Sequence, residues 1–324
     1  RLTDPKPRRH RTPSVTITWQ PESGHARTRL ETDAAALGLR RIEIPTAVGT
    51  VIARVGVAAS PVATVLLHGA AGSWTTWTPL LRAAARRHDP VRNIVALDLP
   101  GWGESPFPSD GVDIGRFSEA IREVVTQLGY ERWDVIGHSL GGALALDLAA
   151  RFPDRTESVF LVSPSGPAVF DAVRRPLRGG LRLPGFAGML LAMRILRALG
   201  DASAPLLRAL DRGGLLRPLS APLFASPRRI DPSVVHTLAD EIRPRAFLAA
   251  SRAAAAYDES SWRGIRCPVR SVRGARDVFV GPDDAAGLST LIRDVEETVL
   301  PGAGHFAAVE QPDDVLRLLR RASV

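Results

Sequence analysis

The chain has 324 residues, of which 45% are hydrophobic, and a formal net charge of +8. A chain of this length and composition can bury a sizeable core, either as one large domain or as a domain with an inserted subdomain. Its most apolar stretch, residues 186–199, contains two arginines and is shorter than the ~20 residues that a membrane span needs. We therefore expect no transmembrane segment. We expect residues 186–199 instead to line a pocket or to make weak contact with a membrane surface.

The charge and the cysteine content exclude further classes of protein. Almost all positive charge comes from arginine, with Lys6 the only lysine, and it is spread along the chain. Because no basic stripe alternates with aromatic residues, we expect no nucleic-acid partner. The single cysteine, Cys267, is typical of a reducing compartment and favours the cytoplasm. The twin arginines Arg8 and Arg9 lack the apolar run of a secretion signal, although an upstream segment could have been removed.

The first half of the chain has the pattern of an α/β protein. Residues 1–40 indicate an N-terminal arm, partly disordered, because they begin charged and punctuated by proline. Alternating residues at 41–44 and 50–57 predict two antiparallel strands around a turn at Gly49. Short apolar strands then alternate with helices; the strands are expected at 63–67, 93–97, 133–136 and 158–162. This alternation predicts a mostly parallel sheet with helices on both faces.

The alternation stops after residue 163. Residues 165–257 are rich in Leu, Arg, Pro and Gly and predict helices without a strand. Strands and helices resume at 269–272, after Pro282, at 295–300 and at 312–321. We therefore expect a core formed by residues 41–164 and 258–324, with a helical cap at 165–257. Such a cap would cover the carboxyl ends of the strands, where ligands of open α/β sheets bind.

Ser139 is the first candidate for a reactive group. It stands in the pattern G-H-S-L-G between a predicted strand and a predicted helix. In such a turn the serine has a strained backbone, and a Cβ on either flanking glycine would collide with the crossing chain. The helix that follows favours a developing negative charge beside the hydroxyl. The same pattern also occurs in simple tight turns, so its context decides between the two interpretations.

Five segments together resemble the α/β-hydrolase fold superfamily, in its serine-nucleophile branch with a helical cap. They are LLHGAAGSW at 66–74, LDLPGWGES at 97–105, VIGHSLGGALAL at 135–146, IRCPVRSVRGARD at 265–277 and PGAGHFAAVEQP at 301–312. The resemblance extends from about residue 41 to the end of the chain, except for the cap. It implies the α/β fold described above, with a mostly parallel central sheet. No cofactor is implied, and no metal-ligand spacing is present in the sequence.

The resemblance also implies roles for matching residues. Ser139 would be the nucleophile, and His305 the general base that takes its proton. Asp277 would be the acid that orients His305. The backbone N–H groups of Ala70 and Leu140 would form the oxyanion hole for the negative charge of the tetrahedral intermediate.

Other residues near these motifs have weaker indications. Ala71 is an alternative to Ala70 as an oxyanion donor. Trp74 and His138 are the candidate substrate-binding residues, although packing explains such residues in a turn equally well. Asp284 follows Pro282 at the expected start of a helix, which makes it a helix-start residue rather than a rival to the predicted acid.

The expected activity is hydrolysis of a carboxylic ester or a related acyl compound through an acyl-enzyme. A serine at the nucleophile position argues against the branches that attack through a carboxylate, such as epoxide hydrolases. The apolar cap favours an apolar or aryl acyl group as the small-molecule substrate. Three alternatives remain: a carbon–carbon bond hydrolase, a cofactor-free perhydrolase, and a non-catalytic homologue that binds a ligand or serves as an accessory protein. The sequence leaves the oligomeric state open.

Overall fold

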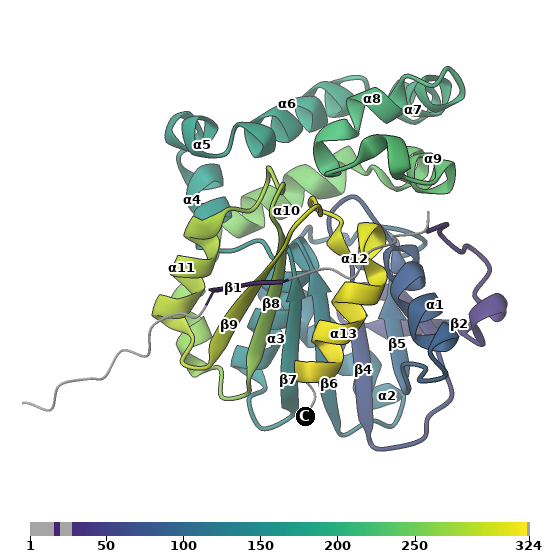
Figure 1. The fold of residues 1–324 in the computed structure, drawn as a ribbon, viewed down its shortest axis with the longest axis vertical. Helices are drawn as coiled ribbons and strands as arrows, with labels where there is room; N and C mark the ends of the chain where they lie inside the picture. Colours follow the sequence, from purple (N-terminus) through teal and green to yellow (C-terminus); the bar gives the residue numbers. More distant parts are fainter. Residues whose placement is uncertain (1–15, 20–27, 323–324) are drawn as a thin grey trace, which may run out of the picture.

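The structure is a computed structural model that describes residues 16–19 and 28–322. In this part of the chain, nine strands form one sheet in the order β1-β9-β8-β7-β6-β4-β5-β3-β2 (Figure 1). The strands are β1 (Thr16–Thr18), β2 (Arg40–Thr46), β3 (Gly49–Val55), β4 (Val62–Leu67), β5 (Ile94–Leu97), β6 (Arg132–His138), β7 (Thr156–Val162), β8 (Val269–Gly274) and β9 (Val295–Leu300). In this spatial order, each pair of neighbouring strands from β1 through β9, β8, β7, β6 and β4 to β5 is parallel. Strand β3 is antiparallel to both of its neighbours, β5 and β2. This confirms the predicted fold class.

The side-chain pattern of each strand follows its place in the sheet. The central strands β4 to β7 are nearly continuous apolar runs because helices cover both of their faces. The edge strand β2 alternates instead, with Ile44 buried between exposed Glu43 and Pro45. The antiparallel pair predicted around Gly49 is therefore confirmed at this edge.

Helices cover the two faces of the sheet. They are α1 (Thr78–Arg86), α2 (Ile114–Gln127), α3 (Leu140–Arg151), α11 (Pro282–Leu291), α12 (Ala307–Glu310) and α13 (Pro312–Ala322), with 3₁₀ turns η1 (Ala35–Leu37), η2 (Trp74–Trp77) and η6 (Glu259–Gly264). The pair α1 and α13 packs on one face, and α2 and α3 pack together on the other (Figure 1). Helix α2 begins directly after Asp113, whose side chain caps it by accepting a hydrogen bond of 2.8 Å from the backbone N–H of Arg116.

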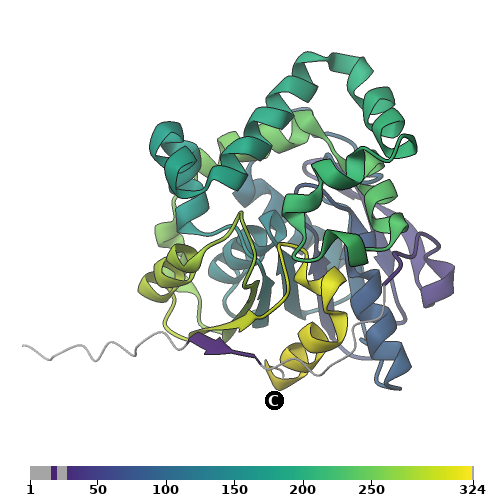
Figure 2. The same ribbon diagram turned by 45° about the horizontal axis from the view of Figure 1, so that its top comes forward.

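A helical cap stands between β7 and β8, over the carboxyl ends of the strands (Figure 2). It contains α4 (Pro167–Arg174), α5 (Pro176–Arg182), α6 (Pro184–Ala198), α7 (Ser203–Arg212), α8 (Leu216–Leu219), α9 (Pro232–Glu241) and α10 (Pro244–Ala256), with 3₁₀ turns η3 (Gly200–Ala202), η4 (Ala221–Leu223) and η5 (Pro227–Arg229). Most of these helices begin at a proline. A proline fits the first turn because a backbone N–H at that position would have no partner within the helix, so nothing is lost by its absence. The prolines of this region therefore mark where the cap helices begin.

The sequence predicts an N-terminal arm at 1–40 without a strand, but the described residues of this segment include one. Residues Thr16–Thr18 form β1 along β9, and the indole N–H of Trp19 donates a hydrogen bond of 2.8 Å to Asp314. A strand of three residues carries too little pattern to be recognised in a sequence. The predicted disorder falls on residues 1–15 and 20–27, which lie outside the described residues.

Candidate active site

Ser139 lies at the sharp turn between β6 and α3. Its backbone has φ 52° and ψ −116°, a conformation that costs about 1–3 kcal/mol for a residue with a side chain. A Cβ on Gly137 would lie 2.3 Å from the carbonyl oxygen of Gly141, and a Cβ on Gly141 would lie 2.2 Å from that of Leu67. Both positions therefore require glycine. The strained turn is held by a hydrogen bond of 3.1 Å from the Ser139 N–H to the carbonyl of Val162.

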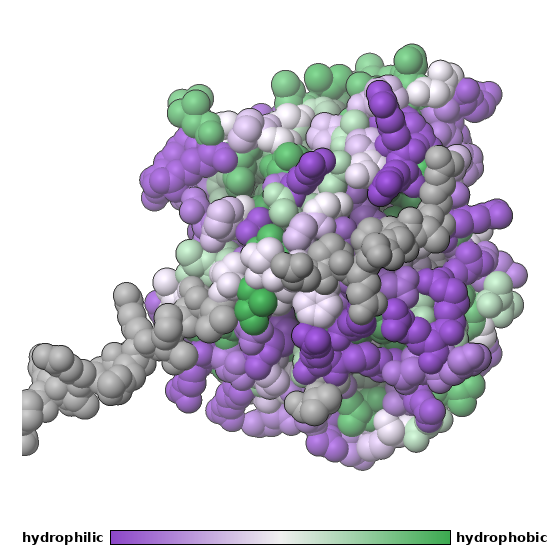
Figure 3. Space-filling model, in the orientation of Figure 1, coloured by the Kyte–Doolittle hydropathy of each residue, from purple (hydrophilic) through white to green (hydrophobic). Residues whose placement is uncertain are grey.

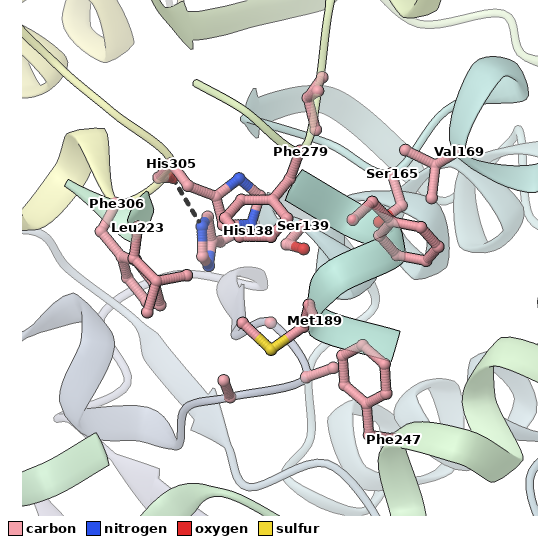
Figure 4. Close-up of a pocket in the computed structure, with 15 residues that line it drawn as sticks. His138, Ser139, Ser165, Val169, Met189, Leu223, Phe247, Phe279, His305 and Phe306 are labelled. Carbon is pink, nitrogen blue, oxygen red and sulfur yellow. Dashed lines mark hydrogen bonds between the residues drawn. The ribbon is translucent and has the colours of Figure 1, made fainter. Parts of the chain in front are cut away.

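Ser139 and His305 line one apolar pocket between the sheet and the cap (Figure 4). Core loops contribute Gly69, Ala70, Ala71, His138, Ser139, Ser165, Phe279, Val280, His305 and Phe306, and the cap contributes Val169, Phe186, Met189, Leu223 and Phe247. The cavity measures about 50 Å³. This cavity is small, so with the cap in this position the pocket leaves room for a small group.

Asp277 and His305 are brought together by neighbouring strands, β8 and β9. The Nδ1–H of His305 donates to the Asp277 carboxylate, with distances of 3.0 Å to Oδ2 and 3.2 Å to Oδ1. Burial alone would raise the pKa of Asp277. The charge of His305, its hydrogen bond and the backbone N–H of Phe279 outweigh burial and hold that pKa below its ordinary value. Asp277 is therefore ionised, and it binds the Nδ1 side of the His305 ring, so Nε2 is the ring nitrogen that the carboxylate does not contact.

Two buried side chains fix the loop that follows β4. His68 accepts a backbone hydrogen bond at Nε2 (2.9 Å), so its Nδ1–H donates to the carbonyl of Gly69 at 2.7 Å. The indole N–H of Trp102 donates to the carbonyl of Ala70 at 2.8 Å. In a trans peptide the N–H points opposite to the carbonyl, so these bonds also fix the N–H groups of Ala70 and Ala71. Both alanines line the pocket, and both stay candidate oxyanion donors.

Leu140, the other predicted oxyanion donor, is the first residue of α3. The first N–H groups of a helix have no partner within the helix, and the helix dipole favours negative charge beside them. The Leu140 side chain is buried in the core and does not line the pocket. Only its backbone can therefore take part in a reaction at Ser139.

His138 lines the pocket and also holds the loop of His305. Burial, reinforced by the neighbouring His305, lowers the pKa of His138 to about 3, so its ring is neutral. Its Nε2–H donates to the carbonyl of His305 at 3.0 Å (Figure 4). The ring centroid lies 4.9 Å from that of His305 and 4.8 Å from that of Phe306. His138 is therefore placed both to contact a ligand and to position His305.

Trp74 is not among the residues that line the pocket, which corrects the prediction that it binds substrate. Its side chain is buried in the core, and the Arg54 guanidinium lies 5.1 Å from the centre of its ring. Its backbone N–H donates to Asp98 at 3.0 Å. A tryptophan that packs within a turn has the same sequence pattern as one that lines a pocket, so the sequence alone could not separate them.

Several pocket residues were missed by sequence reasoning. Phe279 lies beside His305, with 5.0 Å between ring centroids, and Phe306 follows His305 directly. Both stand within two residues of a predicted site residue, and this closeness in sequence could have identified them as pocket residues. Phe247 comes from α10 of the cap, where nothing in the sequence marks it. With Phe186 of α6, four phenylalanine rings therefore line the pocket.

Asp284 joins the core to the cap. It lies in the first turn of α11, where the sequence predicts a helix start. Its Oδ1 accepts backbone hydrogen bonds from Ala168 (2.9 Å) and Val169 (3.3 Å), in the first turn of α4. Its Oδ2 accepts one from Gly281 (3.4 Å), in the loop that follows Asp277. Burial raises the pKa of Asp284 to about 7, against the effect of these three N–H groups.

Glu310 makes a second connection of the same kind. Its Oε1 accepts hydrogen bonds from the backbone of Ala225 (2.8 Å) and Ser226 (3.3 Å) in the cap. Its Oε2 accepts one from Gly304 (2.6 Å), which precedes His305. Burial raises the pKa of Glu310 to about 7. The loop of His305 is therefore bound to the cap segment between η4 and η5.

Comparisons with known proteins agree with this architecture. The profile of a family described as alpha/beta hydrolase fold matches residues 63–312. An uncharacterised protein of Mycobacterium tuberculosis is 27% identical over 286 residues, which cover 82% of this chain and 76% of that protein. A soluble epoxide hydrolase of a Corynebacterium species is 37% identical over 98 residues, 30% of this chain and 33% of that enzyme.

Among solved structures, a thermophilic esterase from Thermogutta terrifontis superposes with a TM-score of 0.64 at 20% sequence identity, covering 87% of this chain and 97% of the esterase. This likeness supports the fold. Because the family profile spans well over half of the sequence, the chain belongs to the α/β-hydrolase fold family.

Proposed function

We propose that this hydrolase is a serine hydrolase that cleaves a carboxylic ester or a related acyl compound through an acyl-enzyme. Ser139 would be the nucleophile, His305 the general base, and Asp277 the acid that orients it. One observation carries the proposal: the ionised Asp277 holds His305 by Nδ1 in a pocket that Ser139 also lines. This leaves the Nε2 of His305 to take the proton of a serine hydroxyl.

The proposed reaction has two halves. Ser139 Oγ attacks the carbonyl carbon of the substrate while His305 takes the hydroxyl proton, and the charged oxygen of the tetrahedral intermediate is bound by backbone N–H groups. The proton on His305 then passes to the leaving alcohol, which departs and leaves an acyl-serine. Water attacks the acyl-serine while His305 takes a proton from that water. When the second tetrahedral intermediate collapses, His305 returns this proton to Ser139 Oγ, and the acid is released.

The pocket supports an apolar acyl group. In the described chain no arginine or lysine lines it, and its walls are mostly Phe, Met, Leu and Val. A ring-fission product, the substrate of a carbon–carbon hydrolase, would bring a carboxylate that this lining gives no cation to meet. We therefore rank the ester above that alternative.

The cytoplasm stays the proposed compartment. The one cysteine, Cys267, is buried, and burial raises its thiol pKa to about 11. Such a thiol is largely protonated and inert at neutral pH, so it offers no second nucleophile and no exposed site for oxidation.

The test compares hydrolysis of p-nitrophenyl esters of graded chain length by the wild type and by Ser139→Ala. We expect turnover by the wild type and a loss on the order of 10³-fold or more in the variant, with the fold retained. A fluorophosphonate should label the wild type but not Ser139→Ala. Equal turnover by both proteins would contradict the assignment of Ser139. Absence of both turnover and labelling in the wild type would favour the non-catalytic alternative.

A further inference from the structure

The outer layer of the cap exposes many large apolar side chains. Figure 3 shows apolar residues gathered along the top of the molecule, over α5 and α6. We call this group the outer apolar face; its members are Leu177, Leu181, Leu191, Ile195, Leu199, Leu206, Leu215 and Leu219. Elsewhere in the described chain only Ile17, Val57 and Val278 are large apolar residues with comparable exposure. Such a concentration on one side marks an interaction surface.

Helix α6 is apolar on two sides. Its inner side buries Leu190 and Met193 against Phe247 of α10. Its outer side exposes Leu191 and Ile195, which are 57% and 55% accessible to solvent. A surface helix normally keeps its large apolar residues on the side that faces the core. The outer side of α6 therefore lacks the cover that its composition calls for.

Positive charge accompanies the exposed apolar side chains. Residues 176–219 carry seven arginines and two aspartates, a net charge of +5 out of the +8 of the whole chain. Arg194 and Arg197 lie on α6 among the exposed apolar residues, and both are exposed. Neither has an ion pair with any residue of the described chain. One of the two aspartates, Asp211, is already bonded to His236.

We propose that the outer apolar face docks on an anionic lipid bilayer. Exposed Leu and Ile beside Arg is the composition of helices that lie in the interface between lipid and water. Each arginine near a negatively charged leaflet adds attraction, whereas a second copy of this chain would bring the same net charge of +5 and be repelled. The charge therefore favours lipid over self-association as the cover of this face.

Docking would place the pocket close to the lipid. Phe186 and Met189, on the inner side of α6, line the pocket, while Leu191 and Ile195 face outward from the same helix. One helix, about 10 Å in diameter, would therefore separate the cavity from the bilayer. This proposal depends only on the surface of the cap and stands apart from the assignment of the catalytic residues.

Vesicle flotation tests the proposal. The wild type is mixed with vesicles of phosphatidylcholine alone or with added phosphatidylglycerol. We expect binding to the anionic vesicles that weakens with salt, and a partition coefficient lower by about tenfold or more in the double variants Leu191→Ser/Ile195→Ser and Arg194→Glu/Arg197→Glu. Matched controls are Val57→Ser and Arg92→Glu, two exposed residues at the opposite end of the sheet, which should bind like the wild type.

The fold of each variant is checked by circular dichroism and thermal unfolding, so the result does not depend on enzymatic activity. Arg194→Gln/Arg197→Gln is a milder second pair that should weaken binding by a smaller factor. Absence of wild-type binding to anionic vesicles would overturn the proposal, as would binding that both double variants retain. A dimer seen by sedimentation that the Leu191→Ser/Ile195→Ser variant abolishes would assign the face to a second copy instead.

Discussion

Asp284 of the core accepts a hydrogen bond of 2.9 Å from the backbone N–H of Ala168, in the first turn of the first cap helix. Glu310 makes a matching contact of 2.8 Å with Ala225, between η4 and η5 of the cap. Each carboxylate also binds a backbone N–H of a loop that carries a predicted catalytic residue. The position of the cap and the position of these loops are therefore set by the same two side chains.

Replacing Asp284 by Asn should reduce the pH dependence of stability. Its pKa is raised from 3.8 to about 7, so the folded protein holds a proton that the unfolded chain releases. The free energy of unfolding therefore falls as the pH rises from about 4 to about 7, by on the order of 4 kcal/mol for this group, and levels off above that range. Urea unfolding of the wild type at pH 5 and pH 8 should show this fall, and Asp284→Asn should show a smaller one.

Asp283→Asn is the matched control, because Asp283 is the exposed neighbour of Asp284 on the same helix. This variant should keep the wild-type difference between the two pH values. An Asp284→Asn protein that loses as much stability between pH 5 and pH 8 as the wild type would contradict the prediction. A remaining slope is expected, because Glu310 also has a pKa raised to about 7.

Replacing Glu310 should disturb turnover more than substrate binding. Glu310→Ala leaves three backbone N–H groups without their carboxylate, including that of Gly304 beside His305. We expect the variant to lose about 1–3 kcal/mol of stability, and kcat to fall about tenfold while KM changes little. Glu310→Gln keeps one oxygen acceptor and should recover part of both losses.

The control for Glu310 is Asp313→Ala, which removes a partly exposed carboxylate from the neighbouring helix, away from the pocket, and should leave kcat unchanged. Steady-state kinetics with one p-nitrophenyl ester, together with urea unfolding, measures both effects. A Glu310→Ala enzyme with wild-type kcat would show that the loop of His305 keeps its place without this carboxylate.

A methyl group on Gly69 should suppress activity. A Cβ there would lie 2.9 Å from the Cβ of Ser139 and 2.9 Å from the Nδ1 of His138, too close for either atom. The loop carrying the predicted oxyanion donors would have to move, so we expect Gly69→Ala to lower kcat/KM by about 100-fold. Gly188→Ala is the control, because a Cβ on this exposed glycine of α6 meets nothing within 4 Å. Similar activities of the two variants would contradict this account of Gly69.

The sequence predicts the core of this fold well because its signals are local. The apolar runs of β4 to β7 and the glycines around Ser139 are short patterns that can be recognised within a few residues of sequence. For the cap, the sequence predicts helices but not how they pack. The contacts between the cap helices are irregular and leave no simple period in the sequence. The roles of Asp284 and Glu310 could not be predicted either. Asp284 binds Ala168 across 116 residues of sequence, and only the folded chain brings those two groups together.

The acyl preference should respond to one methionine of the pocket. The cavity is about 50 Å³, so we expect acetyl and butyryl esters to be cleaved faster than octanoyl esters. Met189 lines this cavity from α6, and Met189→Ala would lengthen it by about three heavy atoms. Since each methylene accommodated is worth about 1–3 kcal/mol of discrimination, the ratio of kcat/KM for octanoyl to acetyl ester should rise about tenfold or more.

Met193→Ala is the matched control for this change. Met193 is the same residue type on the same helix, but it is buried against Phe247 and does not line the cavity. Its replacement removes core packing and should lower the free energy of unfolding by about 2–5 kcal/mol, while the octanoyl-to-acetyl ratio stays at the wild-type value. The ratio, rather than either rate, is the informative quantity, because a loss of folded enzyme lowers both rates equally. If Met189→Ala and Met193→Ala change the ratio to the same extent, the chain length is set by the looseness of the cap and not by the wall at Met189.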